Sequence, residues 1–363
     1  MRYLRSVVIP RFAIGDRILS RTPSWHQVQP AACGFSRTAA KKLVCTSMAT
    51  PSKESIILAG VTFEGVSVGG QETCIILPQY KVAFDIGRCP QRAVNMETIL
   101  FSHCHLDHIS GIAAYVGSRS MLSLRPPRMV VPKPNAAGID ALMEAYRVLD
   151  TSDLPYELVP SEVGDEIDFP NRNMIARVFR TYHVVPSQGY LLCSQKKKLK
   201  QEYLGLPGSD IKALRDEGVE VCDVVEVPEV AFTGDTTSEW ITDPANQDVL
   251  RAKLLFMEVT FLDDTRDAQD AQRFGHTHIS EVVENAHLFQ NQAIVFIHFS
   301  ARFKIEEIER HLDERLPPSL RHRVTPLLAG FSRSSSSPAS KSDGEKNPKK
   351  EMKEAPHIAG VAN

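Results

Sequence analysis

The chain contains the run Phe101-Ser102-His103-Cys104-His105-Leu106-Asp107-His108, in which four metal-capable side chains fall within six residues. Alternate residues of an extended segment point the same way, so His103 and His105 share one face after an apolar strand expected at 98–101. The chain then turns, and Asp107 and His108 face a second position beside the first. Imidazole and carboxylate donors without thiolate suit zinc in an open, catalytic site. The alternative is a polar loop with chance histidines, which only twelve His in the chain disfavour.

Composition excludes several classes of protein. The 363 residues are 42% hydrophobic, enough for one large domain or two ordinary ones. No apolar run is long enough to span a membrane. With a net charge of −2, the chain lacks the overall positive charge typical of nucleic-acid-binding proteins, so any basic surface must be local. Seven scattered Cys without a C-x-x-C pair favour a reducing compartment, and Cys104 alternates away from its neighbouring histidines, so it is expected to pack in the core.

The two ends differ in composition from the middle of the chain. Residues 1–53 carry nine Lys and Arg against a single acid, Asp16, which is typical of an organellar transit peptide; an ordinary disordered tail is the alternative. Translation from Met48 would give a cytosolic product. Residues 332–363 are rich in Ser, Lys, Pro and Glu and are predicted to be disordered. The folded domain is therefore predicted at 54–331.

Between these ends, strand after strand finishes in a His, Asp or Glu. Residues 173–183 end in His183, 229–236 deliver Asp235, 253–260 carry Glu258, and 293–302 form a last strand that delivers His298. By itself, His183 is as readily a turn residue as a ligand. The recurrence predicts two sheets with one metal site along their shared edge and helices outside. The helices are expected at 110–116, 136–149 and 280–290.

Asp85 and the segment 194–228 each leave two interpretations open. Asp85 ends a strand expected at 81–87, where it is either an orienting partner for a metal-bound imidazole or a turn residue. Residues 194–228 interrupt the strand rhythm and contain a helix-like stretch at 209–217. Their basic run comprises Lys196, Lys197, Lys198 and Lys200. This insertion is either a phosphate-binding appendage or a solvated surface segment.

Taken together, these motifs resemble those of tRNase Z (ribonuclease Z), the short form of a plant-like type, within the metallo-β-lactamase superfamily. The metal motif followed by His183, Gly234-Asp235-Thr236 and His298 resembles the superfamily's ordered ligands. The narrower likeness rests on Phe256-Met257-Glu258-Val259-Thr260, on Gly275-His276-Thr277 and on His298-Phe299-Ser300-Ala301-Arg302. The resemblance covers residues 56–331 and implies an α/β fold: the metallo-β-lactamase αββα sandwich, with two mixed β-sheets flanked by helices.

The resemblance also implies which residues bind metal and which transfer protons. Two zinc ions per subunit would be held, one by His103, His105 and His183 and the other by Asp107, His108 and His298, with Asp235 bridging them. Asp107 would accept a proton from the attacking water, and His276, oriented by Glu258, would protonate the leaving 3′ oxygen. Ser300 and Arg302 would bind substrate phosphate, or they are simply a strand-end turn and a surface arginine.

The implied activity is endonucleolytic removal of the 3′ trailer from precursor tRNA. The family resemblance further implies a homodimer and a tRNA-binding arm at 194–228, and the leader favours chloroplast over mitochondrion. One departure is visible: residues 64–73 stand where the family has a Pro-x-Lys-x-Arg-Asn loop that senses the tRNA 3′ end. Rejection of CCA-ended tRNA is therefore left open.

Two other functions remain to be weighed. A small-molecule phosphodiesterase or thioester hydrolase on the same fold would use the same ligands but would not need Glu258, His276 or the basic run. An inactive RNA-binding subunit would be expected to have lost ligands, and here every ligand position is filled. A structural zinc site is disfavoured because such sites are closed and rich in thiolate.

Overall fold

The chain alternates buried strands with surface helices, and the computed structural model describes residues 55–169 and 172–334. The strands are β1 (Ile56–Leu58), β2 (Val61–Gly69), β3 (Glu72–Leu77), β4 (Val82–Phe84), β5 (Thr98–Leu100), β6 (Arg128–Pro132), β7 (Glu157–Ser161), β8 (Glu166–Phe169), β9 (Met174–Arg180), β10 (Gln188–Leu199), β11 (Cys222–Phe232), β12 (Leu254–Glu258), β13 (Ala293–Ile297), β14 (Phe299–Ser300) and β15 (Val324–Pro326). The α-helices are α1 (Leu106–Ile109), α2 (Ile112–Met121), α3 (Ala136–Asp150), α4 (Gly208–Asp216), α5 (Glu239–Thr242), α6 (Ala268–Phe274), α7 (Ile279–Glu284), α8 (Ile305–Arg315) and α9 (Pro318–Arg321).

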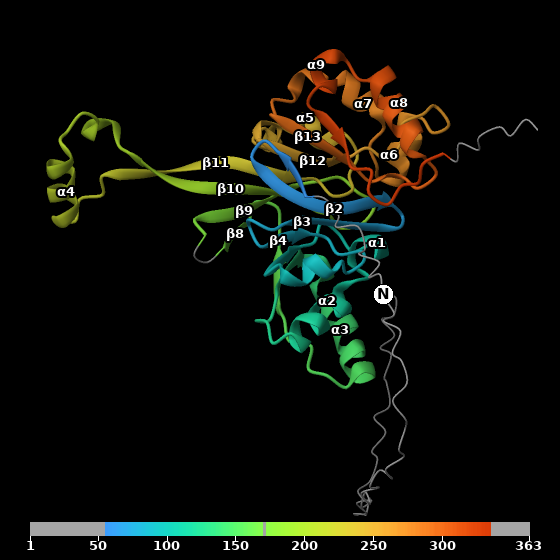
Figure 1. Ribbon diagram of the computed structural model, residues 1–363, viewed down its shortest axis with the longest axis horizontal. Helices are drawn as coiled ribbons and strands as arrows, with labels where there is room; N and C mark the ends of the chain where they lie inside the picture. Colours follow the sequence, from blue (N-terminus) through green and yellow to red (C-terminus); the bar gives the residue numbers. More distant parts are fainter. Residues whose placement is uncertain (1–54, 170–171, 335–363) are drawn as a thin grey trace, which may run out of the picture. The chain divides into compact units, whose positions relative to one another are not determined.

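The strands form two mixed sheets. The first runs β1-β2-β3-β4-β5-β6-β7 with β14 beside β2, and the second runs β15-β13-β12-β11-β10-β9-β8. Antiparallel pairs such as β2–β3 and β9–β10 occur beside parallel pairs such as β5–β6 and β12–β13. Helices α2 and α3 lie outside the first sheet, and α5, α7, α8 and α9 lie on the side of the second (Figure 1). The expected αββα sandwich is confirmed.

Side-chain alternation along β13 shows why the layers assemble in this way. Ala293, Val295 and Ile297 belong to the core between the sheets, whereas Ile294 and Phe296 pack under the outer helices. A strand buried on both faces needs an unbroken apolar run, which 293–297 supplies. Across the sheet interface, the rings of Phe84 and Phe232 stack with their centroids 4.5 Å apart. Such pairs add about 0.5–1.5 kcal/mol beyond the burial of their apolar area.

The metal motif lies where β5 ends and the chain turns into helix. Thr98–Leu100 is completely enclosed by neighbouring strands, as expected, and Cys104 packs against the core beneath α2 and α3. The helix predicted at 110–116 is observed as α2, which starts at Ile112 and continues to Met121, and a separate short helix, α1, carries Asp107 and His108. The turn predicted after His105 is therefore helical, and it is this short helix that turns Asp107 and His108 into the site.

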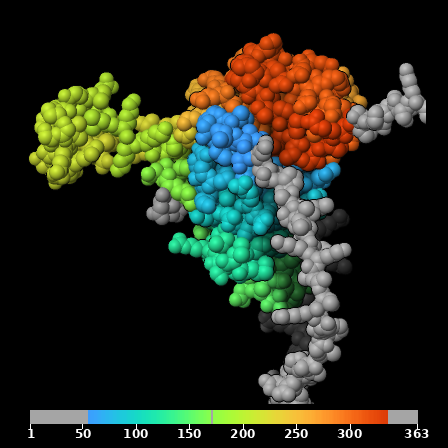
Figure 2. Space-filling model, viewed as in Figure 1, coloured from blue at the N-terminus to red at the C-terminus, as the bar shows by residue number. Residues whose placement is uncertain are grey.

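The segment 194–228 does not interrupt the strands, so the expected break in rhythm was wrong. Strand β10 continues to Leu199 and pairs with β11 as far as Cys222, which places the lysine run within a strand. Helix α4 caps this hairpin, and the hairpin and its tip extend away from the two sheets (Figures 1 and 2). The segment as a whole is not basic, because it holds six Lys and Arg against seven Asp and Glu.

The last predicted strand, 293–302, is in fact two strands in different sheets. Strand β13 belongs to the second sheet, and β14 pairs in parallel with β2 in the first. His298 lies between them with φ +60°, the left-handed conformation that changes the direction of the chain. Helix α8 and strand β15 follow and were not anticipated. The helix predicted at 280–290 ends at Glu284 and gives way to a short 3₁₀ turn.

The predictions of a transit peptide at 1–53 and of a disordered tail at 332–363 concern residues that lie almost wholly outside the described ranges. Within 55–169 and 172–334, no helix is both long and apolar enough to cross a membrane.

Candidate metal centre

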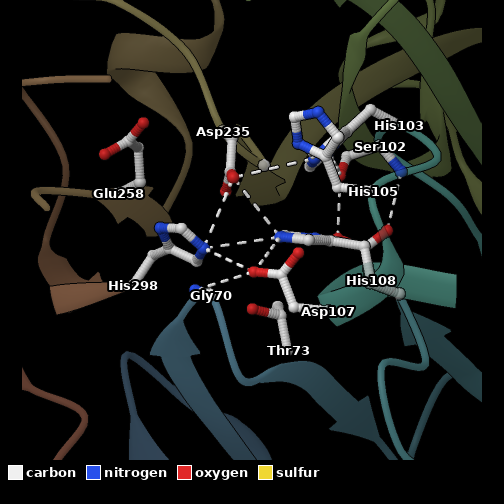
Figure 3. Close-up of polar contacts among 12 residues, drawn as sticks. Gly70, Thr73, Ser102, His103, His105, Asp107, His108, Asp235, Glu258 and His298 are labelled. Atoms are coloured by element: carbon white, nitrogen blue, oxygen red, sulfur yellow. Dashed lines mark hydrogen bonds and ion pairs between the residues drawn. The ribbon is translucent and has the colours of Figure 1, made fainter. Parts of the chain in front are cut away.

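Seven side chains predicted from sequence as metal ligands converge at one edge of the two sheets. All of them except His183 are labelled in Figure 3. His103, His105, Asp107 and His108 come from the segment after β5 in the first sheet. His183 follows β9, Asp235 follows β11 and His298 follows β13, all in the second sheet. The site is therefore built from loops and the short helix α1 at the edges of both sheets.

The first group of donors contains three imidazoles and one carboxylate. His103 Nε2 lies 3.1 Å from His105 Nδ1, which lies 3.2 Å from His183 Nε2. Asp235 Oδ2 is 3.6 Å from His103 Nε2. The four donor atoms lie within 4.8 Å of one another.

The second group consists of Asp107, His108 and His298. The Oδ2 atom of Asp235, from the first group, lies 3.4 Å from His108 Nε2 and 3.3 Å from His298 Nε2. Asp107 Oδ2 lies 3.4 Å from His298 Nε2 and accepts a hydrogen bond of 2.9 Å from the Gly70 backbone N–H. Since one oxygen of Asp235 faces both groups, this carboxylate is placed as a bridge.

These donor sets fit metal ions. Ligand bonds of about 2.0–2.1 Å in a tetrahedron place donor atoms about 3.3 Å apart, the spacing seen within each group. Burial lowers the pKa of His103 well below its ordinary value, and it also lowers the pKa of His105 and His183, so these imidazoles are neutral as metal binding requires. Burial alone would also lower the pKa of His108, but the Asp235 and Asp85 carboxylates raise it well above its ordinary value. The carboxylates therefore favour positive charge at the centre.

A buried carboxylate on each side of the centre orients two histidines. Asp85 accepts hydrogen bonds from His108 Nδ1 and from the Ser102 hydroxyl, both at 2.8 Å, and the Ser102 oxygen lies 3.0 Å from His103 Nδ1. Asp85 adopts φ +55° to do so. This geometry supports the interpretation of Asp85 as an orienting partner. The Nδ1 atoms of His108 and His103 are held by Asp85 and Ser102, and these contacts fix the direction in which the Nε2 atoms point.

Glu258 has the same arrangement on the other side. Its Oε1 accepts from His276 Nδ1 at 2.9 Å, and its Oε2 accepts from the Thr260 hydroxyl at 2.7 Å. The Thr260 oxygen in turn lies 3.1 Å from His298 Nδ1. Burial alone would lower the pKa of His276, but the charge and hydrogen bond of Glu258 raise it to about 9. His276 is thus protonated at neutral pH, with its Nε2 directed away from Glu258.

The predicted phosphate ligands line a cavity beside His276. Ser300 and Arg302 border a cavity of about 450 Å³ that His276, His298 and Gly70 also line. The Arg302 guanidinium is held by Asp263 and Thr265. The lysine run is not brought to the centre: Lys196 lies eight residues along β10 from Gln188, which is roughly 25 Å of extended chain.

Four residues of this centre were not predicted from sequence: Gly70, Ser102, Thr260 and Gly275. The Gly275 carbonyl accepts from His183 Nδ1 at 2.7 Å. Ser102 and Thr260 are adjacent to predicted ligands or strand ends, so their positions carried a signal. Gly70 and Gly275 act through backbone groups, which residue type does not reveal.

The amino-acid sequence is similar to those of known proteins. No protein-family profile matches it. It is 46% identical over 279 residues to tRNase Z TRZ1 of Arabidopsis thaliana, an alignment that covers 77% of this chain and 99% of that protein. The chain belongs to the tRNase Z family. It is also 43% identical over 283 residues to the chloroplastic tRNase Z TRZ2 of Arabidopsis thaliana, covering 78% of this chain and 79% of TRZ2.

Other members of the tRNase Z family are similar over less of the chain. The nuclear ribonuclease Z of Triticum aestivum is 48% identical over 174 residues, which is 48% of this chain and 98% of that protein. Among solved structures, the human short-form tRNase Z aligns over 67% of this chain and 93% of its own, at 20% identity and a TM-score of 0.47.

Proposed function

We propose that the chain is a zinc-dependent endoribonuclease that removes the 3′ trailer from precursor tRNA and leaves a 3′-hydroxyl on the tRNA. The observation that carries the proposal is the pair of donor groups sharing Asp235 beside the Glu258–His276 pair, in a chain of the tRNase Z family. The Glu258–His276 pair supplies a proton donor for a leaving oxygen, and membership of the tRNase Z family favours RNA over a small phosphodiester as the substrate.

The donor groups define where two ions would bind. His103, His105 and His183 would hold one zinc, Asp107, His108 and His298 would hold the other, and Asp235 would contact both. When bound, such ions polarise the phosphate and lower the pKa of the attacking water.

The protein's own groups handle the protons. The hydrogen bond from His298 and the charges of His108 and His298 outweigh burial and lower the pKa of Asp107 to about 2, so this carboxylate is ionised. Its place beside the second group of donors supports the proposal that it accepts the proton of the attacking water. The Gly70 N–H fixes its Oδ2. His276 donates a proton to the leaving 3′ oxygen, and Glu258 keeps it charged and oriented.

Substrate phosphate is proposed to contact Ser300 and Arg302. Their place in the cavity beside His276 supports this role, and Asp263 keeps the guanidinium of Arg302 in a fixed orientation. The arm formed by β10, α4 and β11 is proposed to bind tRNA through Lys196, Lys197, Lys198 and Lys200. Three of these lysines are exposed, and clustered cations bind phosphates irrespective of base sequence.

We also propose that the enzyme is a homodimer located in an organelle, the chloroplast in preference to the mitochondrion. Met121 and Leu149, at the ends of α2 and α3, are 81% and 80% exposed, and such apolar ends suit a contact with a second copy. Met121→Glu with Leu149→Glu should shift sedimentation from dimer to monomer; a monomeric parent would overturn this. Residues 1–53 fused to a fluorescent protein should enter plastids, whereas a product that starts at Met48 should stay in the cytosol.

The activity is tested with residues 48–363 and a labelled precursor tRNA that carries a 3′ trailer. The expected result is one cut at the tRNA 3′ end, lost in Asp107→Ala and kept in Asp153→Ala, an exposed aspartate outside the centre. Hydrolysis of a small phosphodiester or thioester without any cut in the tRNA would contradict the proposed substrate but not the fold. RNA binding without hydrolysis of any of these substrates would instead indicate an inactive subunit.

A further inference from the structure

Two cavities flank the metal centre, and their linings differ in charge. The cavity on the His183 side, about 540 Å³, is lined by Glu239 and by no Lys or Arg among the described residues. The cavity on the His276 side, about 450 Å³, is lined by Arg266, Arg302 and two phenyl rings, Phe261 and Phe274. Only the second cavity offers cations and aromatic surface together, which is the combination that binds single-stranded RNA.

The ring of Phe274 is unusual for its size because 40% of the residue is exposed. It ends α6 and is followed by Gly275 and then His276. The guanidinium carbons of Arg273 and Arg266 lie 4.9 and 5.3 Å from its ring centroid. The Phe261 centroid is 6.5 Å from Phe274 and 6.1 Å from the His276 ring. An exposed aromatic platform with attached cations therefore lies two residues from the proton donor.

The chemistry of the proposed reaction fixes which nucleotide faces this platform. Water forms the new P–O bond and gives its proton to Asp107, while the P–O3′ bond breaks and O3′ takes its electron pair and the proton from His276 Nε2. The nucleotide that keeps O3′ must therefore lie on the His276 side, and the 5′-phosphorylated trailer leaves on the other. That nucleotide is the last one of the tRNA body.

We infer that Phe274 is a stacking residue for the base of the nucleotide whose 3′ oxygen leaves, with Arg266 beside it; this inference rests on the proposed function. Gly69 and Gly70 also line this cavity, where β2 turns directly into β3, and as glycines they offer a base no side chain. The base before the cut is therefore recognised by its aromatic face, which every base presents.

The test uses three precursor tRNAs: one intact, one abasic at the last nucleotide of the tRNA body, and one abasic at the first trailer nucleotide. Phe274→Ala should lower kcat/KM about tenfold on the intact RNA, the loss expected for one stacked base. It should have the same effect when the trailer base is missing, and no effect when the body base is missing. Equal losses on all three RNAs, or no loss on the intact RNA, would overturn the inference.

Further variants separate stacking from packing. Phe274→Tyr should keep activity within about twofold, whereas Phe274→Leu, which is apolar but lacks a ring, should behave as Phe274→Ala. Val184→Ala in the other cavity is the matched control: any loss it causes should persist when the body base is missing. If the parent enzyme does not cut the intact RNA, the proposed function itself fails. If it cuts and Phe274→Leu matches it, only the stacking assignment fails.

Discussion

At the scale of single residues, Gly275 joins the helix ending to the metal centre. Its φ of +79° ends α6, and its carbonyl accepts from His183 Nδ1. A Cβ at this position would lie 2.5 Å from His183 Nδ1, closer than real contacts allow. The histidine therefore depends on a residue without a side chain.

Gly275→Ala is expected to displace His183 and to lower the bound zinc from the proposed two ions toward one per chain, measured by elemental analysis of the purified protein. Gly60→Ala is the control, since Gly60 has φ +78° but nothing within 4 Å of a Cβ. It imposes a matching backbone strain and should leave the zinc content unchanged. Equal zinc content in the two variants would contradict the role given to Gly275.

The His276 pKa predicts the pH profile. Because the pKa is raised to about 9, His276, the proposed proton donor, is charged below that pH and loses its charge as pH rises through it. The alkaline limb of kcat/KM should therefore lie near pH 9. Glu258→Gln removes the charge that raises the pKa, so its alkaline limb should move to lower pH.

Thr260→Val controls for the link from Glu258 to the metal group. It removes the hydroxyl that contacts His298 but leaves the bond between Glu258 and His276. Its zinc content should fall while its alkaline limb stays near pH 9. An alkaline limb that moves as much in Thr260→Val as in Glu258→Gln would argue against His276 as the proton donor.

At the scale of elements, the arm shows how charge and strand register interact. Lys198 is paired in register with Asp223, and Lys196 Nζ lies 3.9 Å from the buried Glu229. Glu229 also binds Lys253. The cations of β10 are thus partly balanced by their own hairpin, and Lys197 is the exposed lysine of the run without such a neighbour.

Lys197→Gln should therefore raise KM for precursor tRNA more than Lys196→Gln does. Neutralising all four lysines should flatten the dependence of log KM on log salt by up to about 3, since each phosphate contact contributes about 0.7–0.9. Lys133→Gln, which removes an exposed lysine outside the arm, should change neither quantity. An unchanged KM in the fourfold variant would exclude the arm as a tRNA contact.

The same element shows where sequence patterns fail. The continuation of β10 through Lys196–Leu199 was not predicted, because the arm has no core to require alternation of apolar and polar residues. Strand β2 was not predicted for a related reason, since Gly65 and Ser67 interrupt its apolar residues. The strand requires that glycine, because a Cβ on Gly65 would lie 2.6 Å from the Cys74 carbonyl oxygen. The motif around His103 and the strand-end residues were predictable because their chemistry is rare and regularly spaced.

At the scale of the whole domain, the metal centre connects the two sheets. Each donor group takes ligands from both: His103 and His105 from the first sheet with His183 and Asp235 from the second, and likewise for the other group. Bound ions would therefore stabilise the packing of one sheet against the other, in addition to the apolar core between them.

Removal of zinc by a chelator should lower Tm on the order of 10 °C, because an ion present at a thousand times its Kd stabilises the fold by about 4 kcal/mol. Scanning calorimetry with and without chelator measures the shift. Asp235→Ala, which removes the shared ligand, should melt at nearly the same temperature in both conditions. A parent protein whose Tm ignores the chelator would show that the ions contribute nothing to stability.

The pairing of β14 with β2 bears on how the protein is made. The His298 backbone N–H binds the Ser67 hydroxyl, a contact between residues 231 positions apart. A ribosome must therefore synthesise the chain past residue 300, and release that part from its exit tunnel, before His298 joins Asp107 and His108, which are made 191 and 190 residues earlier. A nascent chain that has reached only β12 already carries six of the seven donors yet cannot complete the second group. The enzyme should therefore be inactive until its own translation is nearly complete, while the surrounding tRNAs are those that the ribosome is using.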